Sequence, residues 1–538
     1  MILINKYFRY YLLYCVEFVP QLTIKPYMPM ISDTSCNLDS LDVYVPSPEN
    51  PWNVSKINHL YRRAGFGASK AEVLAALAQN DPSALVDSLI DQAIALNTTP
   101  PPIWSTWNRD QFEAAEDANP DNDLGFYRRE GKNQMVNDLI QNRVRDRLTL
   151  FWSNHFVTED DTYRSPAYQT QYYSLLQLHA LGNFRDFVYD IGISNAMLVY
   201  LNGDENIRDR PNENYARELY ELFSLGVDNG YDEDDIQETS KALTGYVDTN
   251  DIPWGDILFN PGQFSNDTKT IFGQTGNWGY DDVINILFQE RASQVATFIC
   301  SKLYAYFVSP TCSDAIVAQM AQTFIANNFE IAPVLRQLLK SQHFFNQEAI
   351  GAVIKSPCDL LICFYNELGF TLTNTDVNDY IRGTVRILGQ DVLNPIDVEG
   401  WQGDEDWISP DLLIGRWESA RFLVNRAWSE NQQQFRDFVV GLPIGTAADG
   451  NLQTTLSGPE VDIVVRALVN YFFPRGMEDT VIFNEISGVF RDIDAFPPSY
   501  YEPDAVAPAR WSLDRQEVAE QFYAFLNYIV DIPEFQLK

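Results

Sequence analysis

The chain has 538 residues, 45% of them hydrophobic, and its 38 basic and 74 acidic side chains give a formal charge of −36 and a pI near 4.3. A surface of that sign repels nucleic acids and anionic membranes, which excludes both as general partners and leaves room only for a local basic pocket. The length and apolar fraction suffice for a large core, with more than one core unit usual at this size.

The first 30 residues contain an apolar run that is interrupted by Arg9 and Glu17 and is followed by no small-residue cleavage site. This is a poor signal peptide, and Met28 or Met30 is an alternative start. We expect the residues before Asn37 to lie apart from the core. No later stretch has the roughly 18 apolar residues of a membrane span, so no integral membrane segment is expected.

Helix start signals and apolar periodicity recur along the chain. Ser69 and Glu72 form a capping-box pattern, and Asp81 followed by Pro82 is typical of a first helical turn. Two short helices joined by a tight turn are predicted within 211–246. The other predicted helices cover 69–80, 81–96, 133–156, 165–183, 183–194, 281–289, 291–308, 313–328, 331–341, 409–428, 458–473 and 514–530.

Strand patterns are weak, and 260–273 is predicted to be a short hairpin or an ordered loop. The fold class is therefore mostly α: a large multi-helix globular domain with a smaller C-terminal helical bundle and few short strands. We expect less than about a tenth of the residues in strands. Helices in such chains bury one another's apolar faces.

Two polar segments are predicted to connect helices. The acidic segment 110–131 is predicted to be a surface loop, and the glycine-containing segment 431–456 a linker. The predicted division is an N-terminal extension over 1–50, a main helical domain over 51–430, and a C-terminal helical segment over 457–538 that packs on the main domain.

The six cysteines are too sparse for a disulfide framework and form no CxxC pair. Buried free thiols are favoured. The alternative, in an oxidising compartment, is pairing of Cys300 with Cys312 or of Cys358 with Cys363.

Eight motifs follow one another along the chain: HLYRRAGFGAS, LTLFWSNHF, HALGNFRDFV, RPNENYARELYELFSLGV, GYDEDDIQETSKALTGY, KTIFG, VIKSPCDLL and LGQDVLNPIDVEGWQGDEDWI. In this order they resemble the bacterial family catalogued as domain of unknown function 1800. The resemblance runs roughly from His59 to Val424, and the closing IPEFQLK is similar as well. It implies an exported protein, periplasmic or extracellular, with a partner from a sulfatase-related family, but no reaction.

The chain departs from the family pattern at two places. Many members have a His-Asp pair where this chain has Phe264 and Ser265, and some have His where Phe223 stands. No role of those histidines carries over to this chain.

Three of the four histidines, His59, His155 and His179, lie inside these motifs, whereas His343 lies at a helix end. A neutral imidazole can ligate a metal or act as a general base near pH 7. The spacing matches neither HxH nor HExxH, so a site would have to assemble across helices. The alternative for each ring is a hydrogen-bonded packing role.

Helix-capping and pairing rules explain part of the stretch 211–246. Asn212 can cap the first helix, Arg217 stands four residues from both Glu213 and Glu221, and Asp232 can cap the second helix. A calcium site in DNGYDEDD is rejected, because its acidic side chains already serve as caps.

Asn214 and Glu218 are not explained by these rules. They share one side of the helix with Leu222, which we expect to face the interior. A buried Glu218 must be paired, so we expect it to contact Arg147, His155 or His179, and breaking the pair should cost roughly 3 kcal/mol.

These patterns give a candidate site. The candidate catalytic side chains are His155, His179 and Glu218, and the candidate ligand-binding ones are Arg62, Arg63, Arg147, Arg217 and Asn214. Such a pocket would suit an anionic ligand. The alternative is a buried structural ion network.

The segment GWQGDEDWI adds Trp401 and Trp407 as ligand-binding candidates, because indole rings beside carboxylates suit carbohydrates. Asp404, Glu405 and Asp406 between them could hold a divalent cation, although no cofactor or metal site is predicted. The alternative is a loop whose tryptophans fill the core.

Two functions follow from these candidates. The first is an exported helical protein that binds or acts on an acidic or sulfated glycan through an Arg/His/Glu pocket. The second is a non-catalytic surface or assembly protein that works with a sulfatase-related partner. A helical metalloenzyme is weaker than either. Under the first function His155, His179 and Glu218 should line one accessible cleft; under the second they should be buried beside an exposed apolar patch.

Overall fold

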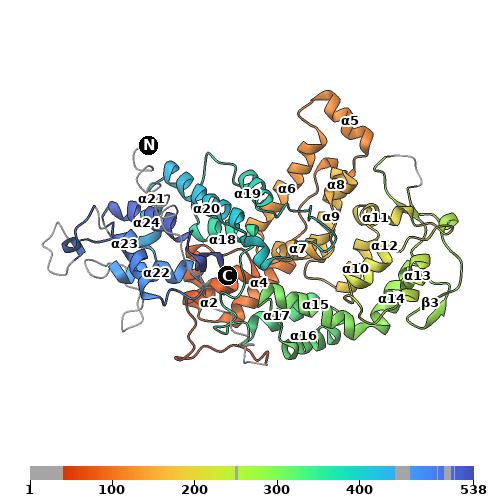
Figure 1. Cartoon of the computed structure of the whole chain (residues 1–538), viewed down its shortest axis with the longest axis horizontal. Helices are drawn as coiled ribbons and strands as arrows, with labels where there is room; N and C mark the ends of the chain where they lie inside the picture. Colours follow the sequence, from red (N-terminus) through yellow and green to blue (C-terminus); the bar gives the residue numbers. More distant parts are fainter. Residues whose placement is uncertain (1–39, 249–252, 443–460, 493–494, 502–510, 514) are drawn as a thin grey trace, which may run out of the picture. The chain divides into compact units, whose positions relative to one another are not determined.

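Helices dominate the part of the chain that the computed structural model describes, which is residues 40–248, 253–442, 461–492, 495–501, 511–513 and 515–538 (Figure 1). All of these residues belong to one compact unit, Leu38–Lys538. The predictions for the segment before Asn37 lie outside the described residues. No helix in the described part is long and apolar enough to cross a membrane.

The helices of the first half alternate with short loops. They are α2 (Val54–Ala64), α3 (Lys70–Gln79), α4 (Pro82–Ala95), α5 (Arg109–Ala118), α6 (Leu124–Gln141), α7 (Val144–His155), α8 (Asp160–Tyr163), α9 (Pro166–His179), α10 (Phe184–Gly192), α11 (Asn195–Tyr200), α12 (Asn214–Glu221) and α13 (Glu233–Ala242), with the short 3-10 helices η1 (Ile103–Thr106) and η2 (Gly203–Glu205) between them.

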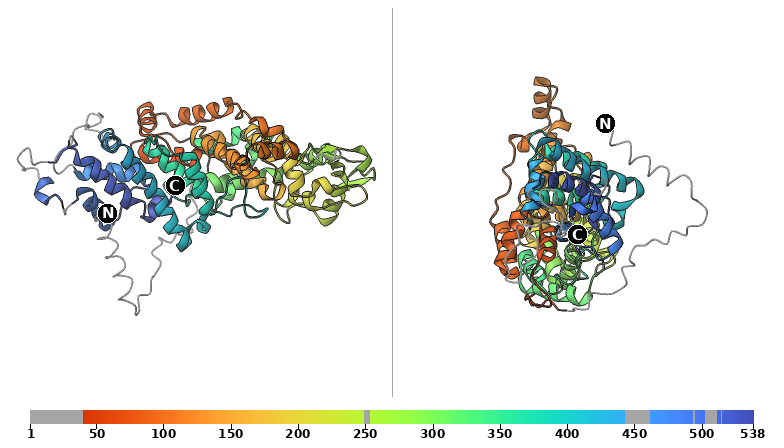
Figure 2. Two further views of the ribbon diagram at one scale, coloured as in Figure 1. Left: turned by 90° about the horizontal axis from the view of Figure 1, so that it is seen from above. Right: turned by 90° about the vertical axis from the view of Figure 1, so that its left-hand side faces the viewer.

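The second half continues in the same way. Its helices are α14 (Tyr280–Glu290), α15 (Ala292–Phe307), α16 (Asp314–Ala326), α17 (Ile331–Lys340), α18 (Pro357–Leu368), α19 (Val377–Ile387), α20 (Pro410–Glu430), α21 (Gln433–Val440), α22 (Val461–Phe472), α23 (Thr480–Arg491) and α24 (Glu517–Ile529), and η4 (Asp404–Ile408) precedes α20. Helices α20 to α24 gather together, with α24 against α20, α21 and α23 (Figure 2).

The strands of the described residues are two to three residues long. β1 (Tyr246–Val247) pairs with β2 (Leu258–Phe259), and β3 (Lys269–Ile271) pairs with β4 (Gln274–Gly276), both antiparallel. The mostly α prediction with few short strands is confirmed. The hairpin expected in 260–273 is present, although its second strand lies just beyond that range.

Two predictions about helix boundaries are wrong. The segment 110–131 is not a loop but holds α5 and the first part of α6, since Asn108 and Asp123 cap the two helices. The helix expected over 133–156 is broken, because Arg143 adopts a left-handed backbone at φ 50° between α6 and α7. The Arg143 side chain turns away to pair with Glu72 at 2.8 Å.

The predicted division into domains stays a prediction. The expected linker 431–456 begins with helix α21, and its residues 443–456 lie outside the described part. On the other side of that segment, α22 packs against α2. Of the cysteines that the structure describes, Cys300, Cys312, Cys358 and Cys363 are all free, as favoured from the sequence.

Two buried ion pairs tie distant parts of the chain to α18. Arg62 of α2 donates to both carboxylate oxygens of Glu367 at 2.5 and 3.1 Å. Its guanidinium also donates to the carbonyl oxygens of Tyr471 and Phe472 at the end of α22. Bidentate pairing and carbonyl contacts are what a fully buried guanidinium requires.

The second pair is centred on Asp359 in the first turn of α18. Arg147 of α7 donates to one carboxylate oxygen, and the Lys538 ammonium donates to the other at 2.5 Å. Burial works to raise the pKa of Asp359, but the two cations outweigh it and hold that pKa well below its usual range. The carboxylate is therefore ionised at neutral pH.

The tail that carries Lys538 lies in the interior beside α2 and α18 (Figure 1). Leu537 forms an antiparallel bridge with Ile354, and the Lys355 amide donates to the Gln536 carbonyl at 2.8 Å. The Lys355 ammonium in turn donates to the carbonyl of Phe535 at 2.8 Å. This short stretch is thus fixed to the residues that lead into α18.

We predict that Asp359→Asn lowers the free energy of unfolding by about 3–5 kcal/mol, because it leaves Arg147 and Lys538 buried without a counter-charge. Urea denaturation followed by circular dichroism measures the change. Asp87→Asn is the matched control. Asp87 also bridges an arginine and a lysine, Arg336 at 2.7 Å and Lys340 at 2.6 Å, but its side chain is 41% exposed.

The control should cost less than about 1 kcal/mol, because exposed ion pairs contribute little. Equal losses for the two variants would contradict the dominant role of the buried pair.

Candidate functional site

Helix α12 buries a different face from the one predicted. Its buried residues are Tyr215, Ala216, Leu219 and Tyr220, whereas Asn214 is exposed and Glu218 is half-buried. The predicted phase rested on Leu222, which lies just after the helix and is only half-buried. The large aromatic rings, not Leu222, mark the inner face.

The prediction that Glu218 is buried against a cation from another helix is therefore wrong. Arg147 pairs with Asp359, and His179 pairs with Asp190 at 2.7 Å. Within the described residues the Glu218 carboxylate makes no ion pair. Burial is the main reason why the pKa of Glu218 is raised, and repulsion from Glu221 and Glu399 raises it further. Attraction to Arg217 opposes these effects.

The polar stripe of α12 forms as the sequence predicts. Arg217 reaches Glu213 at 3.4 Å and Glu221 at 3.2 Å, and it gains Glu233 from α13 at 2.7 Å. Asp232 and its reciprocal partner close the predicted capping box of α13. The Arg217 guanidinium is therefore already paired with carboxylates of the protein.

Two of the motif histidines are buried packing residues. His59 Nε2 donates to the Phe344 carbonyl and His155 Nε2 to the Phe223 carbonyl, both at 3.0 Å. Burial, helped by nearby cations, lowers the pKa of both rings well below the usual value. Both imidazoles are neutral and enclosed. His155 therefore cannot meet a ligand without local opening.

Three of the candidate arginines are likewise internal. Arg62, Arg63 and Arg147 are at most 1% exposed. Arg63 donates to the carbonyls of Val308 and Ala349, both at 3.1 Å. The buried ion network, which was the alternative interpretation, thus describes where these side chains lie. Their ligand-binding roles, and the catalytic roles of His155, His179 and Glu218, stay predictions.

Asn154 at the end of α7 holds the loop that contains Trp401. Its amide nitrogen donates to the Trp401 carbonyl at 3.0 Å, and its oxygen accepts from the Trp401 amide at 2.6 Å. Gly400 makes this contact possible. Its φ is 77°, and a Cβ there would lie 2.4 Å from Asn154 Oδ1.

The carboxylates of this loop lie near α12. Repulsion from Glu399 adds to the effect of burial in raising the pKa of Glu218. Burial and the hydrogen bond that the Tyr200 hydroxyl donates to Glu159 at 2.9 Å raise the pKa of Tyr200, and the charges of Asp397 and Glu218 raise it further. The structure therefore brings Glu218 close to the tryptophan loop rather than to the three buried candidate arginines.

Trp407 is buried and Trp401 is half-buried, so the first ring is not available as a platform for a ligand. Asp404, which lies in η4, has a pKa raised by burial, while Glu405 and Asp406 are exposed. The described residues contain no group of three His, Cys, Asp or Glu side chains that could hold a metal. A cation at this loop stays an alternative that the sequence allows but does not favour.

One pocket, which we call the open pocket, has a volume of about 400 Å³. This is within the usual size of ligand sites. It is lined by charged and aromatic side chains from five elements and loops: Arg109, Arg164, Tyr168, Asp204, Asp248 and Trp254.

Backbone strain positions two of these side chains. Trp254 and Arg164 have φ values of 61° and 58°, in the left-handed region that non-glycine residues rarely occupy. Trp254 is held by an edge contact with Phe112, and the Arg109 guanidinium lies 5.7 Å from its ring centroid. Strain of this kind persists where the surroundings fix it, and it is common at ligand sites.

The acidic side of the open pocket is partly desolvated. Burial raises the pKa of Asp204, and repulsion from Glu205 and Asp248 raises it further. Backbone hydrogen bonds to the carboxylate oppose this shift. Arg164 on the other side is exposed and forms no ion pair with a described residue. The open pocket therefore offers both strong acceptors and strong donors.

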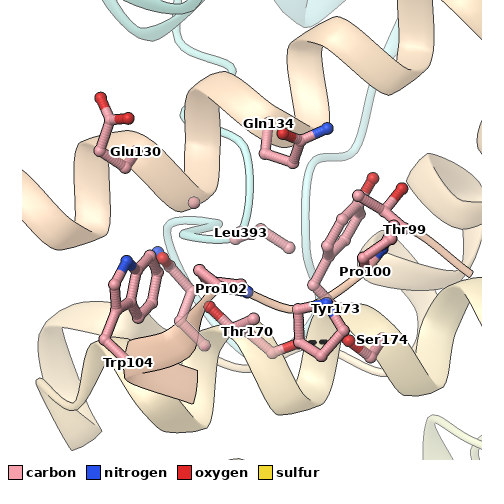
Figure 3. A pocket seen from close by; sticks show the side chains of 13 residues that line it. Thr99, Pro100, Pro102, Trp104, Glu130, Gln134, Thr170, Tyr173, Ser174 and Leu393 are labelled. Carbon is pink, nitrogen blue, oxygen red and sulfur yellow. Dashed lines mark hydrogen bonds between the residues drawn. The ribbon is translucent and has the colours of Figure 1, made fainter.

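A second, smaller pocket, which we call the proline pocket, has a volume of about 120 Å³ and lies between α6 and α9 (Figure 3). Pro100 to Pro102 and Trp104 form one wall, and Gln134 faces them from α6. Glu130 lies on α6 with its carboxylate turned away from the wall (Figure 3).

Neither pocket contains a side chain that the sequence singled out. Three lining residues, Arg109, Glu130 and Gly131, lie in or beside the segment expected to be an acidic loop, so that error hid part of both pockets. The run of three prolines before Trp104 was the available signal for the smaller one.

The fold and pockets define a large α-helical protein with Arg62, Arg63 and Arg147 inside and its pockets elsewhere. The family described as "Protein of unknown function (DUF1800)" matches residues 59–537, nearly the whole chain, and the protein belongs to that family. The match includes the C-terminal helices. Searches of curated proteins and of solved structures gave no match.

We predict that Gly400→Ala destabilises the fold by about 2 kcal/mol or more, because the new methyl group must displace the Asn154 amide from a residue with positive φ. Thermal unfolding measures the loss. Gly383→Ala in α19 is the control, since nothing lies within 4 Å of the added carbon, and it should stabilise slightly. An unchanged melting temperature for Gly400→Ala would contradict the Asn154 contact.

We predict that Glu218→Gln stabilises the protein at pH 7, by less than about 1 kcal/mol. A carboxyl whose folded-state pKa is raised favours the protonated form, so ionisation costs stability above that pKa. The gain should therefore shrink as the pH falls towards the unfolded value of about 4.3. Urea unfolding at several pH values measures it.

Glu233→Gln is the control, since it removes an exposed partner of Arg217 and should give no gain. A loss near 3 kcal/mol for Glu218→Gln would instead restore the predicted buried pair.

Proposed function

We propose that the protein binds a glycan that carries carboxylate or sulfate groups, and that the open pocket holds it. The observation that carries this proposal is the meeting of the Trp254 ring with two arginines and two aspartates around one opening of ligand size. The pocket takes the place of the Arg/His/Glu pocket expected from the sequence, because Arg62, Arg63 and Arg147 are buried and Arg217 is paired with carboxylates of the protein.

Each group supports a different part of such a ligand. The half-buried Trp254 indole can stack on the C–H face of a sugar ring. Asp204 can accept hydrogen bonds from hydroxyl groups. The planar guanidinium groups of Arg109 and Arg164 match carboxylate and sulfate oxygens in a bidentate way.

The charge of the whole chain makes local arginines necessary. At −36 the protein repels a polyanionic ligand, so an anionic sugar must meet guanidinium groups that are already positioned. A sulfated ligand would also agree with the sulfatase-related partner that the family resemblance implies. That partner belongs to the proposal.

Calorimetric titration with three oligosaccharide classes tests the proposal: a neutral glucan, a polyuronate and a sulfated galactan. We expect the two acidic classes to bind more tightly than the glucan and to weaken as salt is raised. Trp254→Ala should weaken binding of the acidic classes roughly tenfold, the effect of about 1.4 kcal/mol. Arg164→Ala should remove the preference over the neutral glucan.

Trp278→Ala and Arg386→Ala are the matched controls. They remove a half-buried indole and an exposed guanidinium that do not line the open pocket, and should leave binding unchanged. Absence of binding for all three classes, or binding that Trp254→Ala leaves intact, would overturn the proposal.

A further inference from the structure

Asp138, a buried carboxylate beneath the proline pocket, has no basic side chain of the described residues within ion-pair distance. It lies on α6 and is 4% exposed. It is held by neutral donors alone, which are Thr99 Oγ1 at 2.6 Å, Tyr173 OH at 2.8 Å, Gln134 Nε2 at 3.0 Å, Gln177 Nε2 at 3.2 Å and Asn137 Nδ2 at 3.4 Å. Buried charges are normally paired.

These bonds decide the polarity of the pocket. Thr99, Gln134 and Tyr173 line the proline pocket, and each has turned a donor towards Asp138. Gln134 Oε1 is left to the cavity as an acceptor, beside the Thr170 hydroxyl, which has no partner among the described residues and can accept or donate. Pro100 to Pro102 add carbonyl oxygens but no N–H, because proline has none.

Gln169 of α9 supplies a further acceptor. Its amide nitrogen donates to Asp160 at 2.8 Å, which fixes the orientation of the amide. Its oxygen is buried and accepts no hydrogen bond. That oxygen faces Gly131, which lines the pocket, and a Cβ on Gly131 would lie 2.5 Å from it.

No lysine, arginine or histidine lines the proline pocket, and Glu130 is the one charged residue that does. The Trp104 ring offers a negative π face to a cation. The volume of about 120 Å³ holds a group of only a few heavy atoms. The missing component is thus small, positively charged and rich in N–H donors.

We propose that the proline pocket binds a primary ammonium group, carried by a small free amine or by a lysine side chain. The ammonium donates its hydrogens to the acceptors of the wall and offsets the Asp138 charge below them. This inference does not depend on the glycan proposal, because the two pockets share no lining residue.

Calorimetric titration of the full chain at constant ionic strength tests the site. The probes are n-propylammonium, n-propanol, tetramethylammonium and Nα-acetyl-lysine N-methylamide. We expect propylammonium to bind, and neither propanol, which lacks the charge, nor tetramethylammonium, which lacks N–H groups, to do so. Binding of the lysine compound at least as tight as that of propylammonium identifies a lysine side chain as the ligand, and weaker binding identifies a free amine.

Two variants locate the binding. Glu130→Gln, at an exposed position whose carboxylate is turned away from the wall (Figure 3), should weaken propylammonium binding about two- to threefold, through the loss of a nearby charge rather than of a direct contact. Gly131→Ala should weaken it more than about tenfold, because the methyl group fills the space before the Gln169 oxygen. Glu113→Gln on α5 makes the same charge change away from the pocket and should have no effect.

The melting temperature of each variant checks its fold, and Glu130→Gln decides alone should Gly131→Ala unfold. The proposal is overturned when propylammonium gives no heat at tens of millimolar, when tetramethylammonium or propanol binds equally well, or when Glu130→Gln and Glu113→Gln have the same affinity as the unchanged protein.

Discussion

One buried carboxylate, Asp359, sets the arrangement of the helices around it. It joins α7 through Arg147 and the C-terminal tail through Lys538, and the neighbouring Arg62–Glu367 pair joins α2 to the same helix α18. Ions inside a protein are tolerated only when their partners are fixed in place, and removing one partner costs far more than an exposed pair contributes. These pairs therefore fix the relative positions of segments that are distant in sequence.

The buried ion-paired residues do not line either pocket. Both pockets border α9, but they use different faces, since successive helical residues point about 100° apart. Tyr168 lines the open pocket, whereas Gln169, Thr170 and Tyr173 line the proline pocket. One helix thereby separates the pocket that contains Arg109 and Arg164 from the pocket where Thr99, Gln134 and Tyr173 donate to Asp138.

Local rules predicted much of the fold. The capping patterns before α3 and α4, the capping box of α13 and the Arg217 pairs all depend on neighbours within four residues, and all formed. The phase of α12 and the break at Arg143 depend instead on which distant groups cover a surface. Neither pocket could be found, because lining residues such as Trp104 and Leu393 meet only in the folded chain.

The residues that make internal contacts and the residues that line an opening stand in different parts of the sequence. His59, His155, Arg62, Asn154 and Gly400 stand in the motifs and serve internal contacts that admit few substitutes. Arg109, Arg164 and Trp254 stand outside them and lie at an opening. Exchanging a lining side chain leaves the Asp359 and Glu367 pairs intact, so its effect on stability should be small and independent of theirs. Side chains at the pockets can therefore change while the ion-paired core stays as it is.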